Sequence, residues 1–230
     1  MIKRALKREF DSGRAPLYVM AATPVALMAG FILPPPFAPA LSAFFFFPVF
    51  FYYTRREAYG KLFSLSVFWI FIHFTLVMGA SAIATAPSGP PMEQDWVYFI
   101  RSGFEAFDPA RSIAALIYSC MLSVVSGGVL FLFRTAMVVS HAAQTAGSFL
   151  NEGKDMSVLL SPARLLALAR GAGHLMAGMG LSTVFYMKLE SRPVVWDGPA
   201  KVIITGVAIV LASIFLEMVF APNQNPVFSA

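Results

Sequence analysis

The feature that most constrains this chain is a series of long apolar runs separated by short polar or proline-rich connections. Each run approaches the ~20 residues that an α-helix needs to cross the hydrocarbon core of a bilayer. Hydrophobic residues make up 58% of the 230 residues and charged residues 13%, against about 45–50% and about 25% in soluble domains. A soluble fold of this size cannot hide so much apolar surface from water. The sequence therefore predicts an all-α, polytopic transmembrane helical bundle.

About six spans fit into segment 15–220, which we expect to form one bundle. They are predicted at residues 15–33, 37–53, 62–84, 113–133, 172–187 and 202–220. Prolines mark several boundaries, because proline lacks a backbone donor and its ring clashes with the preceding helical turn. The helix of the fourth span can continue past Phe133 toward Leu150, and the second and fifth spans can be either full or re-entrant.

Short amphipathic helices are expected at the membrane surface. In segment 1–14, basic residues alternate with an apolar face made by Ile2, Leu6 and Phe10, a pattern typical of helices that lie on anionic membranes. A solvated basic tail is the alternative. Segment 92–107 is predicted as an outer amphipathic helix, segment 134–171 as an inner connection and segment 221–230 as a cytoplasmic tail.

The orientation follows from Lys and Arg, which concentrate in cytoplasmic loops. With the N-terminus inside, segments 1–14, 55–61 and 134–170 hold twelve of the 17 basic residues, and the outer loops, 188–201 among them, hold five. This bias predicts a multi-pass protein with both termini in the cytoplasm, and we expect it in the bacterial inner membrane.

His73 is the first candidate for a functional residue, because it lies near the middle of the third predicted span. An ionisable group at that depth is costly and commonly faces protein or a water-filled cavity. A haem ligand, a proton relay and a polar contact between helices are the possible roles. A second haem-ligating histidine at matching depth is missing, since His141 and His174 are expected near the inner boundary. A neutral, hydrogen-bonded histidine is the simplest interpretation.

The second candidate is an inner cluster of polar residues at similar predicted depth. It comprises Arg134, His141, Arg170, His174 and Glu217. Glu217 is the only carboxylate inside a predicted span, so it should be paired, with Arg134 or Arg170, or protonated. A structural clamp and a gating or proton-coupling pair are both compatible with this pattern.

A stripe of small residues at four-residue spacing runs along the fourth predicted span: Ala115, Ser119, Ser123 and Gly127. Small side chains let helix backbones approach closely in a membrane, where hydrophobicity alone does not drive association. The stripe predicts a helix-packing face, used within the chain or as a seam with a second protein.

No motif for nucleotide binding, metal binding or hydrolysis is present in the sequence. We therefore expect no enzyme activity, no cofactor or metal, and no nucleic-acid partner; the expected partners are the lipid bilayer and other membrane proteins. Minimal loops and the packing stripe favour a non-catalytic subunit that scaffolds a respiratory, photosynthetic or secretion complex. The alternative is a small transporter or channel that uses His73 and the Arg134/Glu217 cluster.

Overall fold

The computed structural model describes residues 9–32, 37–83, 109–151 and 162–220, and the regular structure in these ranges is α-helical. The predicted all-α class is therefore confirmed for this part of the chain. The predicted surface segment 92–107 and tail 221–230 lie outside it, as does most of segment 1–14. The long helices are α2 (Ala15–Phe31), α3 (Phe37–Thr54), α4 (Tyr59–Ile83), α6 (Pro109–Ser126), α7 (Val129–Asn151), α8 (Pro162–Leu189) and α9 (Asp197–Phe220).

Four of these helices, α3, α4, α6 and α9, are long and apolar enough to cross a membrane, which indicates a membrane protein. Helix α2 is also apolar, but it has only 17 residues. Helices α7 and α8 are long and more polar, and both pack against several neighbours. A helix that is covered by other helices faces little lipid, so it can carry polar side chains that a lipid-facing helix cannot.

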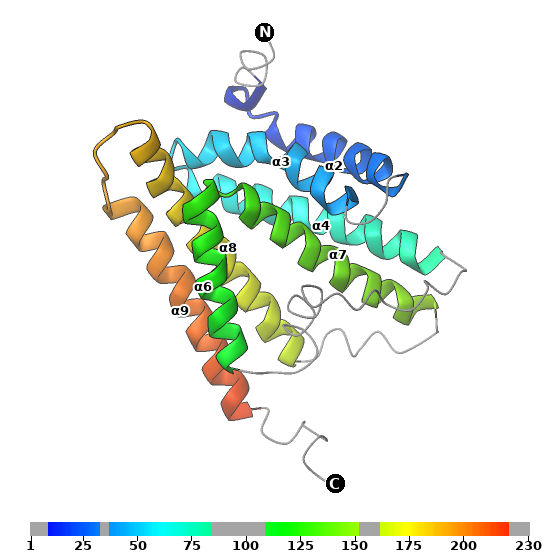
Figure 1. Cartoon of the computed structure of the whole chain (residues 1–230). Helices are drawn as coiled ribbons and strands as arrows, with labels where there is room; N and C mark the ends of the chain where they lie inside the picture. Colours follow the sequence, from blue (N-terminus) through cyan, green and yellow to red (C-terminus); the bar gives the residue numbers. More distant parts are fainter. Residues whose placement is uncertain (1–8, 33–36, 84–108, 152–161, 221–230) are drawn as a thin grey trace.

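The helices form two groups (Figure 1). Helices α2, α3, α4 and α7 run side by side and make the four-helix group. Helices α6, α8 and α9 make the three-helix group, which is inclined to the four-helix group. The chain passes from the second group to the first at the α6–α7 turn.

The two groups pack by different means. Large side chains fill the four-helix group, where Phe46 of α3 stacks on Trp69 of α4 with the ring centres 4.6 Å apart. In the three-helix group the backbones of α8 and α9 approach closely. A Cβ atom on Gly173 would lie only 2.6 Å from the carbonyl oxygen of Gly206, so neither position has room for a larger side chain.

The α6–α7 turn corrects the sequence-based prediction of a single fourth span over 113–133. The structure has two helices there, and they reverse direction at Gly127 and Gly128, whose φ angles are +59° and +97°. Glycine adopts such angles without the clash that a Cβ would cause. Both glycines are buried, and the Tyr186 hydroxyl donates a 2.7 Å hydrogen bond to the Gly127 carbonyl. The protein thus supplies a hydrogen bond to the backbone of this turn that lipid could not supply.

Because the chain changes direction at the α6–α7 turn, two connections that were predicted on opposite sides of the membrane lie at the same end of the bundle. The α3–α4 turn was expected on the inner side and segment 188–201 on the outer side. In the structure an ion pair between Arg55 and Glu190 joins them. The α8–α9 connection therefore lies at the same end of the bundle as the α3–α4 turn, and not at the opposite end as predicted.

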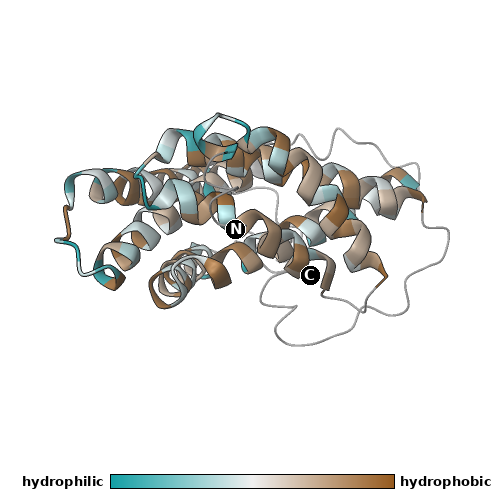
Figure 2. Ribbon diagram, turned by 90° about the horizontal axis from the view of Figure 1, so that it is seen from above, coloured by the Kyte–Doolittle hydropathy of each residue, from teal (hydrophilic) through white to brown (hydrophobic). Residues whose placement is uncertain are grey.

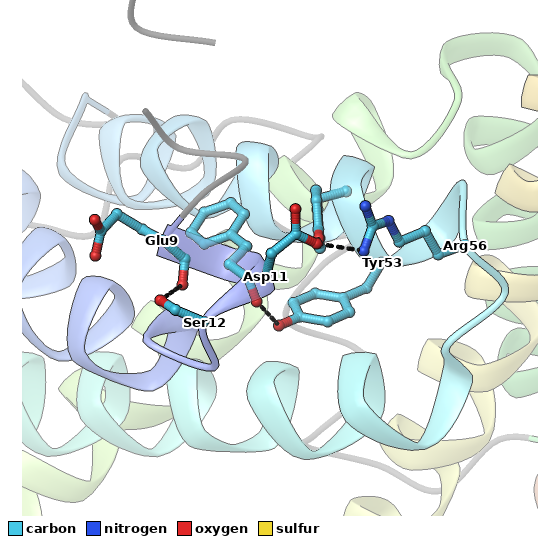
Figure 3. Close-up of polar contacts among 7 residues, drawn as sticks. Glu9, Asp11, Ser12, Tyr53 and Arg56 are labelled. Carbon is cyan, nitrogen blue, oxygen red and sulfur yellow. Dashed lines mark hydrogen bonds and ion pairs between the residues drawn. The ribbon is translucent and has the colours of Figure 1, made fainter. Parts of the chain in front are cut away.

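The polar end of the molecule is the end at which these two turns meet. Figure 2 shows hydrophilic residues gathered toward this end, whereas the helices beyond it are mostly hydrophobic. The segment before α2 also lies here (Figure 3): Arg56 donates to Asp11 at 2.6 Å, and the Tyr53 hydroxyl donates to the Phe10 carbonyl at 3.4 Å. Three stretches that are distant in sequence are thus tied together at one end.

Candidate functional site

His73 lies at the centre of the four-helix group and is completely buried. Its Nδ1 atom is 2.9 Å from the Ser42 hydroxyl of α3, and its Nε2 atom is 2.6 Å from the Ser140 hydroxyl of α7. The Trp69 indole, one turn earlier on α4, donates a 3.0 Å hydrogen bond to the same Ser42 oxygen. We call Ser42, Trp69, His73 and Ser140 the histidine cluster. It connects three helices through hydrogen bonds.

Both ring nitrogens of His73 are therefore occupied. A neutral imidazole has one donor and one acceptor, and a hydroxyl can serve as either, so the two serines match the neutral ring without any further group. This geometry agrees with the interpretation of His73 as a polar contact between helices. The described part of the chain contains no group of three or more His, Cys, Asp or Glu side chains that could hold a metal ion.

A second polar cluster lies in the three-helix group and against α7. Arg170 of α8 donates to the carboxylate of Glu217 on α9, and the two side chains are only 10% and 5% exposed. Of the two arginines expected as partners of Glu217, the structure uses Arg170. This ion pair lies close to the point where α8 and α9 are in backbone contact at Gly173.

Arg134, the sixth residue of α7, turns toward α6. Its guanidinium donates to the Ser119 hydroxyl, and its Cζ atom lies 5.6 Å from the centre of the Tyr118 ring. A hydroxyl and an aromatic face stabilise a guanidinium without neutralising it. No carboxylate in the described ranges pairs with Arg134.

His174 lies one turn after Arg170 on α8. Its Nε2 atom is buried and has no hydrogen-bond partner among the described residues. Arg134 and Arg170 are both close enough to His174 to interact with it electrostatically. We call Ser119, Arg134, Arg170, His174 and Glu217 the arginine cluster. It holds two guanidiniums, one unsatisfied imidazole and one carboxylate in a largely apolar surrounding.

The fifth residue predicted for this cluster, His141, lies on α7 directly after Ser140 and two helical turns beyond Arg134. It is half-buried, and its carbonyl accepts a hydrogen bond from Thr145. On α7 it is therefore next in sequence to the histidine cluster.

The stripe of small residues on α6 faces the interior of this chain. Ser119 and Ser123 are fully buried, and α6 packs against α8 and α7. Gly127 ends the stripe inside the α6–α7 turn, and Ala115 accepts a hydrogen bond from Ser119 through its carbonyl. The stripe thus supports close packing within the chain and also supplies the hydroxyl that holds Arg134.

Three residues of the histidine cluster, Ser42, Trp69 and Ser140, were not predicted as site residues. Ser42 and Ser140 are hydroxyls within long helices, and such a residue in an apolar run is itself a weak signal for an interhelical contact. The sequence contains many other serines of this kind, so the pattern alone does not select these two.

Comparison of the chain with models of known protein families, with curated proteins and with solved structures gave no match.

Proposed function

We propose that this chain is a non-catalytic, multi-pass membrane protein of the transporter or channel class, which binds a small solute at the arginine cluster. The observation that carries the proposal is Arg134, a half-buried guanidinium that has no carboxylate partner in the described part of the chain. Ionisable residues inside transmembrane bundles are costly, and they commonly mark substrate or ion pathways.

The histidine cluster does not support a solute pathway through His73. That ring is enclosed and hydrogen-bonded on both sides, so a passing solute would have to break two buried hydrogen bonds. The polar residues that motivate the proposal lie instead on α7 and α8, the two long helices that are not apolar enough to be candidate spans by themselves. Both pack against several other helices, so their polar side chains can face protein instead of lipid.

The scaffold-subunit hypothesis has less support than it had from the sequence. Its main motivation was a packing face available to a partner, and Ser119 and Ser123 of that face are buried within this chain. It stays a prediction that copurification can test.

We further propose seven membrane crossings, with the N-terminus in the cytoplasm and the C-terminus outside. Segments at the polar end, together with the eight residues that precede them in sequence, hold eleven basic residues, whereas the α4–α6 and α7–α8 connections and the first turns of α6 and α8 hold four. The first set is Lys3, Arg4, Lys7, Arg8, Arg14, Arg55, Arg56, Lys61, Lys188, Arg192 and Lys201, and the second is Arg101, Arg111, Lys154 and Arg164. Positively charged connections stay inside, which supports a cytoplasmic polar end.

Reporter fusions test this orientation. An alkaline phosphatase fused after residue 220 should be active in a bacterial host, whereas one inserted at residue 194 in the α8–α9 connection should be inactive. A green fluorescent protein at the same two sites should give the reverse pattern. A C-terminal phosphatase that is inactive beside a fluorescent C-terminal fusion contradicts the proposal.

Flux measurements test the transporter class. The purified protein is reconstituted into liposomes, and uptake of inorganic anions, carboxylates, amino acids and sugars is compared with that of empty vesicles. We expect uptake of at least one solute, and its loss with Arg134→Gln. Absence of uptake for the whole panel, together with a stoichiometric partner that copurifies from native membranes, would favour the scaffold subunit instead.

A further inference from the structure

We infer that the arginine cluster is a binding site for a small monovalent anion, of the size of chloride or formate, which contacts Arg134 and His174. The inference rests on the proposed function in one respect, because it specifies the chemical class of the solute. The binding site itself can be tested without any transport measurement.

A comparison of the arginines supports the negative charge of the ligand. Five arginines in the described ranges form ion pairs with carboxylates; they are Arg14, Arg55, Arg56, Arg170 and Arg192. Four of them lie at the polar end, where water would stabilise the charge in any case. Arg134 lies inside the bundle and has only a hydroxyl and an aromatic ring. Among these six arginines of the described ranges, the one without a carboxylate partner lies where water would stabilise its charge least.

The charge of the cluster sets the valence of the ligand. Glu217 neutralises Arg170 through their buried ion pair, which leaves the single positive charge of Arg134. Because an uncompensated charge in a low-dielectric surrounding is costly, one negative charge is sufficient to make the cluster neutral. A divalent anion would leave a net negative charge in the same place.

Arg134 and His174 each have polar atoms that an anion could use. A guanidinium has five N–H donors, and the Ser119 hydroxyl occupies one nitrogen of Arg134. The Nε2 atom of the neighbouring His174 is buried without a partner, although a buried polar atom almost always has one. An anion between these two side chains satisfies both. The helix backbones beside His174 are closely packed, with Gly173 of α8 against Gly206 of α9, so we expect the ligand to be small.

Titration calorimetry in detergent tests the site. The protein is prepared in a buffer with gluconate as the only anion and titrated with sodium chloride, sodium formate and sodium sulfate. We expect one chloride or formate per chain and weaker binding of sulfate. Arg134→Gln should weaken binding about 10-fold to 100-fold, the loss expected for a charge-assisted hydrogen bond, and Arg134→Lys should lose less. The control Arg14→Gln, at an exposed ion pair of the polar end, should bind as the wild type does.

Two further variants keep the test decisive if Arg134→Gln does not fold. Ser119→Ala removes the hydroxyl that holds the guanidinium, and His174→Phe removes the second donor; each should weaken binding of chloride and formate. If the wild-type protein binds none of the anions, the inference is wrong. It is also wrong if the Arg134 and His174 variants bind the anions as tightly as the wild type does. Uptake of an uncharged solute without anion binding would keep the proposed function and remove this site. Anion binding without uptake of any solute would support this site and contradict the proposed function.

Discussion

The histidine cluster, inside the four-helix group, and the arginine cluster, between α7 and the three-helix group, deal differently with polar side chains inside an apolar bundle. Around His73, neutral donors and acceptors meet in matching numbers, and the same contacts hold α3, α4 and α7 together. Around Arg134, a charge faces partners that cannot neutralise it, and His174 keeps an unsatisfied nitrogen. A buried polar residue thus indicates function only when the surrounding helices leave some of its hydrogen bonds unmade or its charge unpaired.

The two groups of helices also differ in the contacts that hold them together. Stacked and interlocked aromatic side chains fill the four-helix group. The three-helix group relies on backbone contact between α8 and α9 and on the buried ion pair of Arg170 and Glu217. We therefore expect substitutions in the histidine cluster to change stability alone, and some substitutions in the arginine cluster to change binding as well.

The largest effect is expected from breaking the buried ion pair. Glu217→Gln leaves the Arg170 guanidinium without its negative partner, and removal of one member of such a pair costs about 3–5 kcal/mol. Equilibrium unfolding in mixed detergent micelles measures the change. The double variant Arg170→Met/Glu217→Met should recover most of the loss, because it removes both charges. A loss below about 1 kcal/mol for the single variant would show that the pair is not a structural clamp.

A smaller loss is expected when the histidine cluster is opened. His73→Leu keeps the volume of the side chain but leaves the Ser140 hydroxyl buried without its partner, while Ser42 keeps Trp69. An unsatisfied buried hydroxyl costs about 1–3 kcal/mol. The variant should unfold more easily, and the folded fraction should bind anions as the wild type does. Impaired anion binding by folded His73→Leu would contradict the separation of the two clusters.

The α6–α7 turn lies where the two groups are joined, and its glycine can be tested against a matched control. Gly128→Ala introduces a Cβ at φ +97° and against the Phe50 ring, which should destabilise the protein by about 1–3 kcal/mol. Gly60→Ala, at a helix start with open space around it, should change stability by less than about 1 kcal/mol. Thermal unfolding of both variants measures the two losses of stability. Equal losses would show that the conformation of the α6–α7 turn does not matter for stability.

The smallest effect is expected at the polar end. The ion pair between Arg56 and Asp11 is 47% and 43% exposed, and exposed pairs contribute about 0–1 kcal/mol. Arg56→Gln should therefore shift stability by no more than this, and added salt should reduce the difference further. A loss as large as that for Glu217→Gln would mean that the polar end, not the ion pair inside the bundle, holds the helices together.

Hydropathy and prolines predicted most of the helices, because both report directly on what a helix can contain. The first three predicted spans differ from α2, α3 and α4 by at most three residues at either end. The reversal at Gly127 and Gly128 was missed for a physical reason. Apolar residues flank it on both sides, and the group that satisfies its backbone, the Tyr186 hydroxyl, is 59 residues away in sequence.

The candidate site was predicted only in part for a related reason. A costly charge in an apolar run is visible in the sequence, which is how Arg134, His174 and Glu217 were selected. The choice between Arg134 and Arg170 as the partner of Glu217 depends on how α8 crosses α9, and that crossing is set by glycines in contact across the two helices. Tertiary geometry of this kind has no signature in a single sequence.

One paired measurement tests the central claim, that His73 contributes to stability alone and Arg134 contributes to anion binding. His73→Leu and Arg134→Gln are compared with the wild type in a single thermal unfolding series, in gluconate buffer with and without saturating sodium formate. Formate should raise the unfolding midpoint of the wild type and of His73→Leu by similar amounts, since a ligand that binds the folded state stabilises it. It should raise the unfolding midpoint of Arg134→Gln much less, because that variant binds formate more weakly. A formate-dependent rise in Arg134→Gln equal to that of the wild type, or its loss in His73→Leu, would contradict the account.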